Sequence, residues 1–281
     1  MNNNRLSLLP NLLTTLNLFA GCLAIIFAVD DALILAAYKD VLGFGPFGLS
    51  ILFILLAMVF DMADGFVARI TKTDSRFGIE YDSLADLISF GVAPAVIMYL
   101  SVLRTNGKWG IYFAAIYIVF GALRLARFNI KATDNPDKKY FQGMPIPAAA
   151  GVLVSYVFFF RSVEWYYSES PVLIGQKLTN WYVINVAYIH RWAIPALMVI
   201  LAGLMVSNFK YPALKYYITK ERMPFIIVAG AIAVGPILAM KPYVAIFGMT
   251  TFYMFIGIII TIVQGLKQGK SRRKAVKERN V

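Results

Sequence analysis

The stretch "LSILFILLAMVF" at residues 49–60 continues directly into "DMADGFVARI" at residues 61–70. Apart from Ser50, the first of these segments is entirely apolar, which is typical of a helix that lies in lipid. Asp61 and Asp64 end this apolar run. An aspartate at the centre of a membrane helix costs about 2.5–3.5 kcal/mol even on insertion scales. The chain therefore needs a partner that neutralises these two carboxylates.

The composition of the whole chain is that of a membrane protein. Of its 281 residues, 59% are hydrophobic and 15% are charged, and the mean hydropathy is +0.68. A soluble domain carries about 25% charged residues, so we predict an all-α, polytopic membrane helix bundle. A membrane helix needs about 20 apolar residues. By that measure, spans are predicted at residues 8–29, 47–70, 81–103, 109–129, 146–163, 191–208, 223–240 and 242–264.

The basic residues are distributed unevenly between the two sides of these spans. Seven of the 27 Lys and Arg residues fall on one side, and the other 20 fall on the side that carries both termini. The positive-inside rule then places both termini in the cytoplasm, and we expect an integral protein of the cytoplasmic (inner) membrane. The net charge of +12 could also attract nucleic acid. Because the basic residues flank apolar spans, we expect them to contact membrane lipids and expect no nucleic acid partner.

Four aspartates are placed so that they can meet near the cytoplasmic surface. Asp61 and Asp64 lie late in the second span, and Asp82 and Asp86 lie early in the third. Spacings of three and four put each pair on one helix face, and the short link "TKTDSRFGIE" at residues 71–80 predicts an antiparallel hairpin. Clustered carboxylates repel one another. Oxygen ligands without His or Cys favour Mg²⁺ or Mn²⁺, and four of them suit a two-metal site that handles phosphate esters.

Small and basic residues surround these aspartates. Gly65, Ala68 and Gly78 would let a nucleotide approach the backbone closely. Arg69 and Arg76 supply guanidinium groups for phosphate. Two alternatives stay open: the aspartates could pair with arginines inside the bundle, or they could carry protons or sodium in a transporter. The spacing of four carboxylates disfavours both.

These residues form a long sequence motif. The pattern D-x-x-D-G-x-x-A-R-(x8)-G-x-x-x-D-x-x-x-D is reproduced by Asp61, Asp64, Gly65, Ala68, Arg69, Gly78, Asp82 and Asp86. With eight fixed positions over 26 residues, the chain resembles the CDP-alcohol phosphotransferase family. The resemblance implies a membrane enzyme with a six-helix core. Such an enzyme moves a phosphatidyl group from CDP-diacylglycerol to an alcohol and releases CMP.

The resemblance also implies a role for each position. It makes Asp61, Asp64 and Asp82 ligands of two divalent cations, Mg²⁺ or Mn²⁺. It makes Asp86 the general base, which also reaches a metal. The CDP-diacylglycerol site is implied to include Asn11, Thr14, Gly65, Ala68, Arg69, Ser75 and Gly78.

Other stretches resemble the phosphatidylserine synthase branch of that family. They are "PNLLTTLNLFAG" at 10–21, "FGIEYDSLADLISFGVAPA" at 77–95, "GALRLARFN" at 121–129, "GMPIPAAAG" at 143–151 and "LMVSNFKYP" at 204–212. This likeness predicts a catalytic core over residues 1–215. Residues 216–265 are then additional membrane helices, and residues 266–281 form a basic cytoplasmic tail.

The acceptor alcohol is implied by resemblance alone to be L-serine. Its carboxylate needs a cationic partner, and Arg124 and Arg127 lie three residues apart, so they can share a helix face. Both arginines could equally be positive-inside anchors. The acceptor could also be glycerol 3-phosphate, inositol phosphate or choline, because the motif reports the CDP-lipid and not the alcohol. An ion-coupled transporter is a further alternative, although no second copy of the aspartate pattern follows residue 90. The expected partners are CDP-diacylglycerol, L-serine, membrane lipids and a second copy of the chain in a homodimer.

Overall fold

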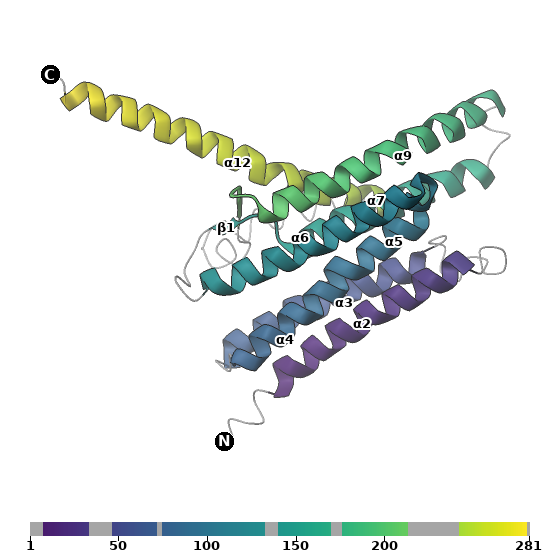
Figure 1. Ribbon diagram of the computed structural model, residues 1–281, viewed down its shortest axis with the longest axis horizontal. Coiled ribbons are helices and arrows are strands. Elements are labelled where there is room, and N and C mark those ends of the chain that lie inside the picture. The colour runs from purple at the N-terminus through teal and green to yellow at the C-terminus, as the bar shows by residue number, and fades with distance from the viewer. Residues whose placement is uncertain are drawn as a thin grey trace.

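The protein is a bundle of long helices with one short pair of strands (Figure 1). The computed structural model describes residues 8–33, 47–71, 75–132, 140–169, 176–212 and 242–279. In these ranges the elements are α2 (Leu8–Leu33), α3 (Gly48–Thr71), α4 (Arg76–Asp86), η1 (Leu87–Val92), α5 (Ala93–Ser101), η2 (Leu103–Asn106), α6 (Lys108–Ala132), β1 (Tyr140–Gln142), α7 (Ile146–Glu169), α9 (Gln176–Val206), β2 (Lys210–Pro212) and α12 (Pro242–Arg279).

Most of these helices are suited to a membrane. Segments long and apolar enough to cross it are Leu8–Asp30, Gly48–Ala68, Arg76–Ser101, Lys108–Ile130 and Tyr243–Gln264, and shorter apolar helices are Ile146–Phe160 and Arg191–Val206. Every predicted span on described residues therefore coincides with a helix, which confirms the polytopic helical bundle. The predicted span at 223–240 lies outside the described residues.

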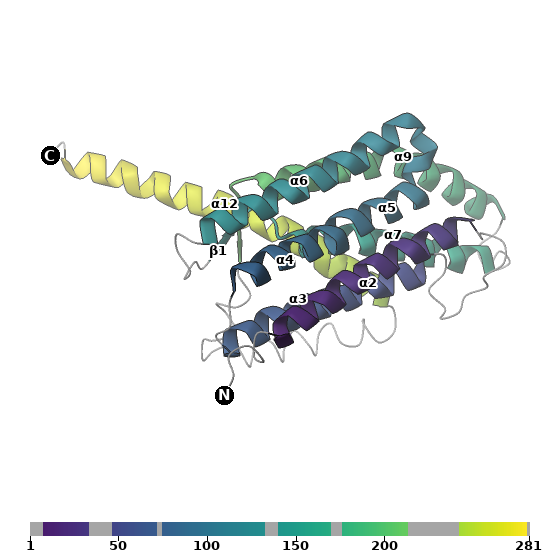
Figure 2. The ribbon, with the colours of Figure 1, turned by 60° about the horizontal axis from the view of Figure 1, so that its bottom comes forward.

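Two helix boundaries differ from the prediction. The third membrane helix begins at Arg76 and not at residue 81, because Ser75 caps it: the Ser75 hydroxyl accepts a hydrogen bond from the Gly78 amide at 3.0 Å. The last helix, α12, does not end near residue 264 but continues to Arg279, so most of the predicted tail is helical. In Figures 1 and 2 this C-terminal part of α12 projects beyond the bundle.

The first helix, α2, packs along α3 and also against α4, η1 and α5. Small residues explain the close approach: Ala20, Ala24 and Ala28 repeat every four residues and are all buried. A side chain at Gly21 would lie 2.3 Å from the Ser89 hydroxyl of η1, so only glycine fits there. The predicted hairpin of the second and third spans is thus arranged around α2, which contacts both partners (Figure 2).

A π-helical turn, η1, joins α4 to α5 directly after Asp86. Pro94 has no N–H group, so the carbonyl of Phe90, four residues earlier, lacks its usual helical donor. The hydroxyl of Tyr117 on α6 donates a hydrogen bond to that carbonyl at 3.1 Å. The wider turn is therefore stabilised from a neighbouring helix. Such turns occur frequently at functional sites.

The strands β1 and β2 form an antiparallel pair that the all-α prediction did not include. They dock α12: the buried Tyr211 hydroxyl donates to the Met254 carbonyl at 3.2 Å, and the Lys210 amide donates to the Thr261 hydroxyl at 2.7 Å. Burial raises the pKa of Tyr211 to about 12, so the hydroxyl stays protonated as a donor. Because α12 also packs against α7, this last helix is joined to the helical core.

Candidate metal and substrate site

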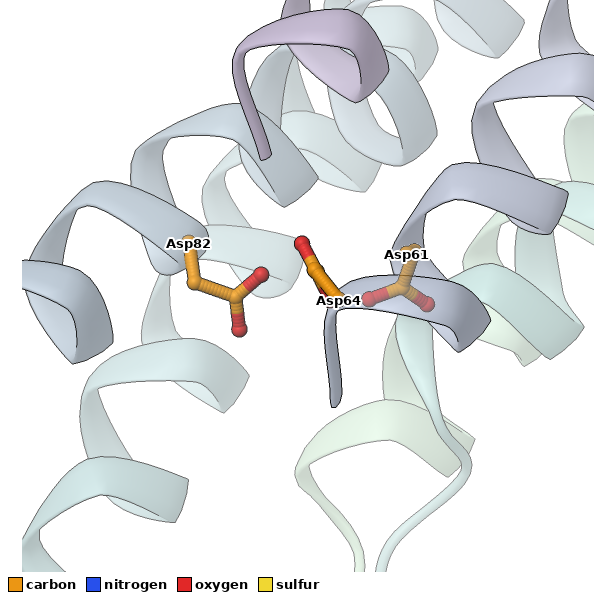
Figure 3. A group of neighbouring side chains, drawn as sticks. All are labelled: Asp61, Asp64 and Asp82. Carbon is orange, nitrogen blue, oxygen red and sulfur yellow. The ribbon is translucent and has the colours of Figure 1, made fainter. Parts of the chain in front are cut away.

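Three carboxylates meet between α3 and α4 (Figure 3). One oxygen from each of Asp61, Asp64 and Asp82 lies within 4.8 Å of the others. Asp64 is buried, and the other two are half-buried. Three negative groups this close repel one another strongly unless a cation lies among them.

The donor set fits a hard divalent cation. Asp82 Oδ1 is buried and has no hydrogen-bond partner among the residues that the structure describes. A carboxylate oxygen in that position needs a proton donor or a metal. Together the three aspartates offer only oxygen ligands, which are the ligands that Mg²⁺ and Mn²⁺ prefer. The cluster can therefore hold a metal ion.

Helix α2 orients one of these ligands. The Thr14 hydroxyl lies 2.8 Å from Asp64 Oδ2 and 3.1 Å from the Pro10 carbonyl, and both Thr14 and Asp64 are buried. Thr14, which the resemblance assigns to the CDP-diacylglycerol site, thus lies beside the acidic cluster. Hydrogen bonds of this kind fix the direction of a metal ligand.

Asp86 is buried at the end of α4, outside the group of three. Its Oδ1 accepts a hydrogen bond from the Asn17 side-chain amide at 3.3 Å. The backbone carbonyl of Asn17 in turn accepts a hydrogen bond from the Ser89 hydroxyl at 2.9 Å. Neither Asn17 nor Ser89 was predicted from the sequence to belong to the site. The available signal was the spacing of Thr14 and Asn17, which puts two polar side chains on one face of an apolar helix.

Arg124 brings a buried positive charge to the same region. This residue on α6 is only 9% exposed, and its charge interacts with those of Asp86 and Asp61. Its guanidinium carbon lies 5.5 Å from the centre of the Phe128 ring. In the described part of the chain, its Nε has no hydrogen-bond partner. The structure therefore places one of the two predicted acceptor arginines beside the aspartates.

Arg127 is engaged elsewhere. Its guanidinium donates hydrogen bonds to the Val206 carbonyl, to the Ser207 carbonyl at 3.2 Å and to Asn208 Oδ1 at 2.8 Å. These groups lie at the end of α9, where helix carbonyls lack partners of their own. Arg127 joins α6 to α9 and so fixes the position of the helix that carries Arg124.

The expected nucleotide-binding residues partly converge. A side chain at Gly78 would lie 3.3 Å from Asn11 Oδ1 and 3.1 Å from the Ser75 hydroxyl, so these three residues are neighbours. Among the described residues, a side chain at Gly65 would meet nothing within 4 Å, which leaves space next to Asp64 in this part of the structure. Ala68 is half-buried one turn further along α3. The side chain of Arg69 lies outside the described residues.

Comparisons with known proteins agree with this site. The model of the CDP-alcohol phosphatidyltransferase family matches residues 7–193. The CDP-diacylglycerol–serine O-phosphatidyltransferase of Helicobacter pylori is 35% identical over 212 residues, which are 75% of each chain. The protein of the same name from Methanocaldococcus jannaschii is 38% identical over 160 residues, 57% of this chain and 61% of the relative. Archaetidylserine synthase of Methanothermobacter thermautotrophicus is 32% identical over 206 residues, 73% of this chain and 69% of the relative.

The match covers most of the chain and includes α2, α3, α4 and α6, the helices that carry the aspartates, Thr14, Asn17 and Arg124. With its helical membrane fold and its acidic cluster, the chain therefore belongs to the CDP-alcohol phosphatidyltransferase family, a family of transferases.

Proposed function

We propose that the protein transfers the phosphatidyl group of CDP-diacylglycerol to L-serine, giving phosphatidylserine and CMP. The observation that carries the proposal is the cluster of Asp61, Asp64 and Asp82 with buried Asp86 and Arg124 beside it. The names of several relatives support serine as the acceptor.

Two divalent cations, Mg²⁺ or Mn²⁺, complete the proposed site. We infer that Asp61, Asp64 and Asp82 hold them, with Asp86 reaching one of the two. When bound, the cations neutralise the charge of the diphosphate and of the CMP that leaves. Oδ1 of Asp82, which has no hydrogen-bond partner in the described ranges, supports this assignment.

Asp86 is the proposed general base. It takes the proton of the serine hydroxyl, and the serine oxygen forms a bond to the phosphorus next to diacylglycerol. The bond from that phosphorus to the bridging oxygen breaks, and CMP leaves with the electron pair. A positioned base typically contributes about 10²–10⁴-fold to the rate.

Replacing this base tests the assignment. The Asp86→Asn variant should bind CDP-diacylglycerol but lose turnover by about 10²-fold or more, because an amide cannot accept the serine proton. Lipid binding and CMP release would be measured on the same purified sample. A variant with a near-normal rate would remove Asp86 from the role of base.

The remaining site residues divide into two proposed groups. CDP-diacylglycerol would be bound by Asn11, Thr14, Gly65, Ala68, Arg69, Ser75 and Gly78. The proximity of Asn11, Ser75 and Gly78 and the open space at Gly65 support this group. The serine carboxylate would contact Arg124, whose buried Nε has no hydrogen-bond partner among the described residues. Arg127 is assigned a positioning role instead, because its guanidinium is bonded to the end of α9.

The proposal extends to the setting of the enzyme. We place the protein in the cytoplasmic membrane as a homodimer, with both termini and the active site on the cytoplasmic side. The excess of basic residues on the side of the termini supports the orientation.

The mass of the purified protein, corrected for bound detergent, would test the homodimer. We also assign residues 1–215 to the catalytic core.

A direct assay decides the reaction. Purified protein would be incubated with labelled CDP-diacylglycerol, Mg²⁺ or Mn²⁺, and in turn L-serine, glycerol 3-phosphate, inositol phosphate or choline. We expect labelled phosphatidylserine and CMP with L-serine only. Product with glycerol 3-phosphate and none with serine would overturn the assignment of L-serine as the acceptor. If no alcohol led to release of CMP, the result would favour a transporter.

A further inference from the structure

Two buried polar atoms beside Asp86 lack hydrogen-bond partners within the described ranges. One is the side-chain oxygen Oδ1 of Asn17, a residue that is 0% exposed. The other is Nε of Arg124 on α6, whose charge interacts with that of Asp86. Buried donors and acceptors are almost always paired in folded proteins, so an unpaired atom of each kind near one carboxylate points to a ligand.

The orientation of Asn17 is fixed by its other contacts. Its Nδ2 donates to Asp86 Oδ1 at 3.3 Å, and its backbone carbonyl accepts from Ser89 at 2.9 Å. Since the amide nitrogen is already bonded to Asp86, the amide oxygen on the same planar group is held in place and is left to accept a hydrogen bond.

The two unpaired atoms have opposite chemical character. Arg124 Nε is a cationic donor, which suits a carboxylate. Asn17 Oδ1 is an acceptor, and an ammonium group carries only donors. An acceptor alcohol that carries a carboxylate and an ammonium group, as L-serine does, would satisfy both atoms with its hydroxyl close to Asp86.

We propose that Asn17 and Arg124 together form a selectivity site for a zwitterionic amino acid: Asn17 Oδ1 accepts a hydrogen bond from the ammonium group, and Arg124 binds the carboxylate. This inference rests on the proposed function and adds the residue that recognises the amino group. It also explains why an amide is buried in the apolar helix α2, where it is otherwise unfavourable.

The test compares three acceptors that share the reacting hydroxymethyl group: L-serine, ethanolamine without the carboxylate, and 3-hydroxypropionate without the amino group. The kcat/KM for each would be measured for the wild type, Asn17→Ala, Arg124→Gln and Ser89→Ala. Any change in Asp86 lowers all three values together, so the ratio between two acceptors reports only the contact that distinguishes them.

We expect a crossed pattern. Asn17→Ala should reduce the preference for L-serine over 3-hydroxypropionate by about tenfold, the usual effect of one hydrogen bond to a charged group, and leave the preference over ethanolamine unchanged. Arg124→Gln should reduce the preference for L-serine over ethanolamine and leave the preference over 3-hydroxypropionate unchanged. Ser89→Ala removes the hydrogen bond to the Asn17 backbone carbonyl but leaves the Asn17 side chain in place. It should lower kcat/KM for all three acceptors without changing either ratio.

If Asn17→Ala lowers all three values equally, Asn17 only positions Asp86, and the inference is wrong. The wild type gives a second measurement that needs no variant. L-alanine, which has both charged groups but no hydroxyl, should inhibit at a concentration about tenfold below that of propionate or ethylamine. Equal inhibition by the three compounds would also overturn the inference. A wild type that makes no phosphatidylserine at all would instead refute the proposed function.

Discussion

Thr14 is the side chain through which the first helix reaches the acidic cluster. Its hydroxyl lies 2.8 Å from Asp64 Oδ2 and is buried with it. The Thr14→Val variant keeps the shape of the side chain but removes this hydrogen bond. We expect the apparent affinity for Mn²⁺ to fall by about tenfold, at the lower end of what the loss of such a partner costs a metal site.

A Mn²⁺ titration of activity and of the Mn²⁺ electron paramagnetic resonance signal would measure this change. The matched control is Thr105→Val, since Thr105 is exposed and bonds only locally, to Val102 and Asn106. An unchanged Mn²⁺ affinity in Thr14→Val would show that Thr14 does not orient a metal ligand.

We expect the Asp82→Asn variant to lower activity but to raise the thermal stability of the metal-free protein. The Asp82 carboxylate lies close to those of Asp61 and Asp64, and its Oδ1 has no partner in the part of the chain that the structure describes. In Asp82→Asn, one negative charge disappears from the cluster. We expect at least about 100-fold lower activity, because a metal ligand is lost. We also expect a higher Tm in the presence of EDTA, because the repulsion between like charges is reduced.

Thermal unfolding in detergent with EDTA and with Mg²⁺ would separate the two effects. Mg²⁺ should raise the Tm of the wild type more than that of the variant. Glu80→Gln is the control, because it removes one exposed carboxylate two residues away on the same helix. A lower Tm for Asp82→Asn in EDTA would contradict the idea that the carboxylates repel one another in the folded protein.

At the scale of elements, the docking of α12 depends on a glycine. A side chain at Gly257 would lie 2.3 Å from the ring of Tyr211, which is buried between β2 and α12. The Gly257→Ala variant should therefore lower the free energy of unfolding by about 1–3 kcal/mol, the usual cost of overpacking. It should also lower activity, because α12 brings Tyr253 near the charge of Arg124.

The control for this variant lies on the same helix. No described residue lies within 4 Å of a side chain added at Gly248, so Gly248→Ala should leave the Tm unchanged or slightly higher. Denaturation in detergent and the rate of CMP release would be measured for both variants. Equal Tm values would show that α12 can shift away from Tyr211 without cost.

Elements differ in how far the sequence predicts them. Hydropathy alone locates the helices, because crossing a bilayer requires long apolar runs. The strand pair is three residues long on each side, and its two halves are far apart in the sequence, so no local pattern predicts it. The π-turn has a local signal in Pro94, but its stabilising partner Tyr117 is 27 residues from Phe90.

The sequence likewise predicts the site only in part. The structure brings Asp61, Asp64 and Asp82 together, with Asp86 outside this group. The motif spacing predicts that all four meet, because spacing on helices fixes which faces they share. It cannot distinguish Arg124 from Arg127, which differ by three residues and have similar chemistry. Only the packing of α6 against α9 shows that Arg127 is bonded to carbonyls about 80 residues away, while Arg124 lies beside the aspartates.

At the scale of the whole molecule, the bundle has two ends, and Lys and Arg are more frequent at the end that carries both termini. In Figure 1, α2 begins and α12 ends on the left of the view. Helix α4, which begins at Arg76 within the motif, lies nearer to that side than α5 does. The proposed orientation places that side in the cytoplasm, where CMP is released.

Cysteine labelling in intact cells tests the orientation. The sole cysteine, Cys22, would first be removed by Cys22→Ser. Single cysteines would then be introduced by Thr105→Cys on η2 and Phe77→Cys on α4, two exposed positions at opposite ends of one membrane-spanning segment. A membrane-impermeant maleimide should label the cysteine at 105 in intact cells, and the cysteine at 77 only after the membrane is opened, because the proposed orientation puts the start of α4 on the cytoplasmic side. The reverse pattern would place the aspartates at the outer surface, where the proposed release of CMP into the cytoplasm is impossible.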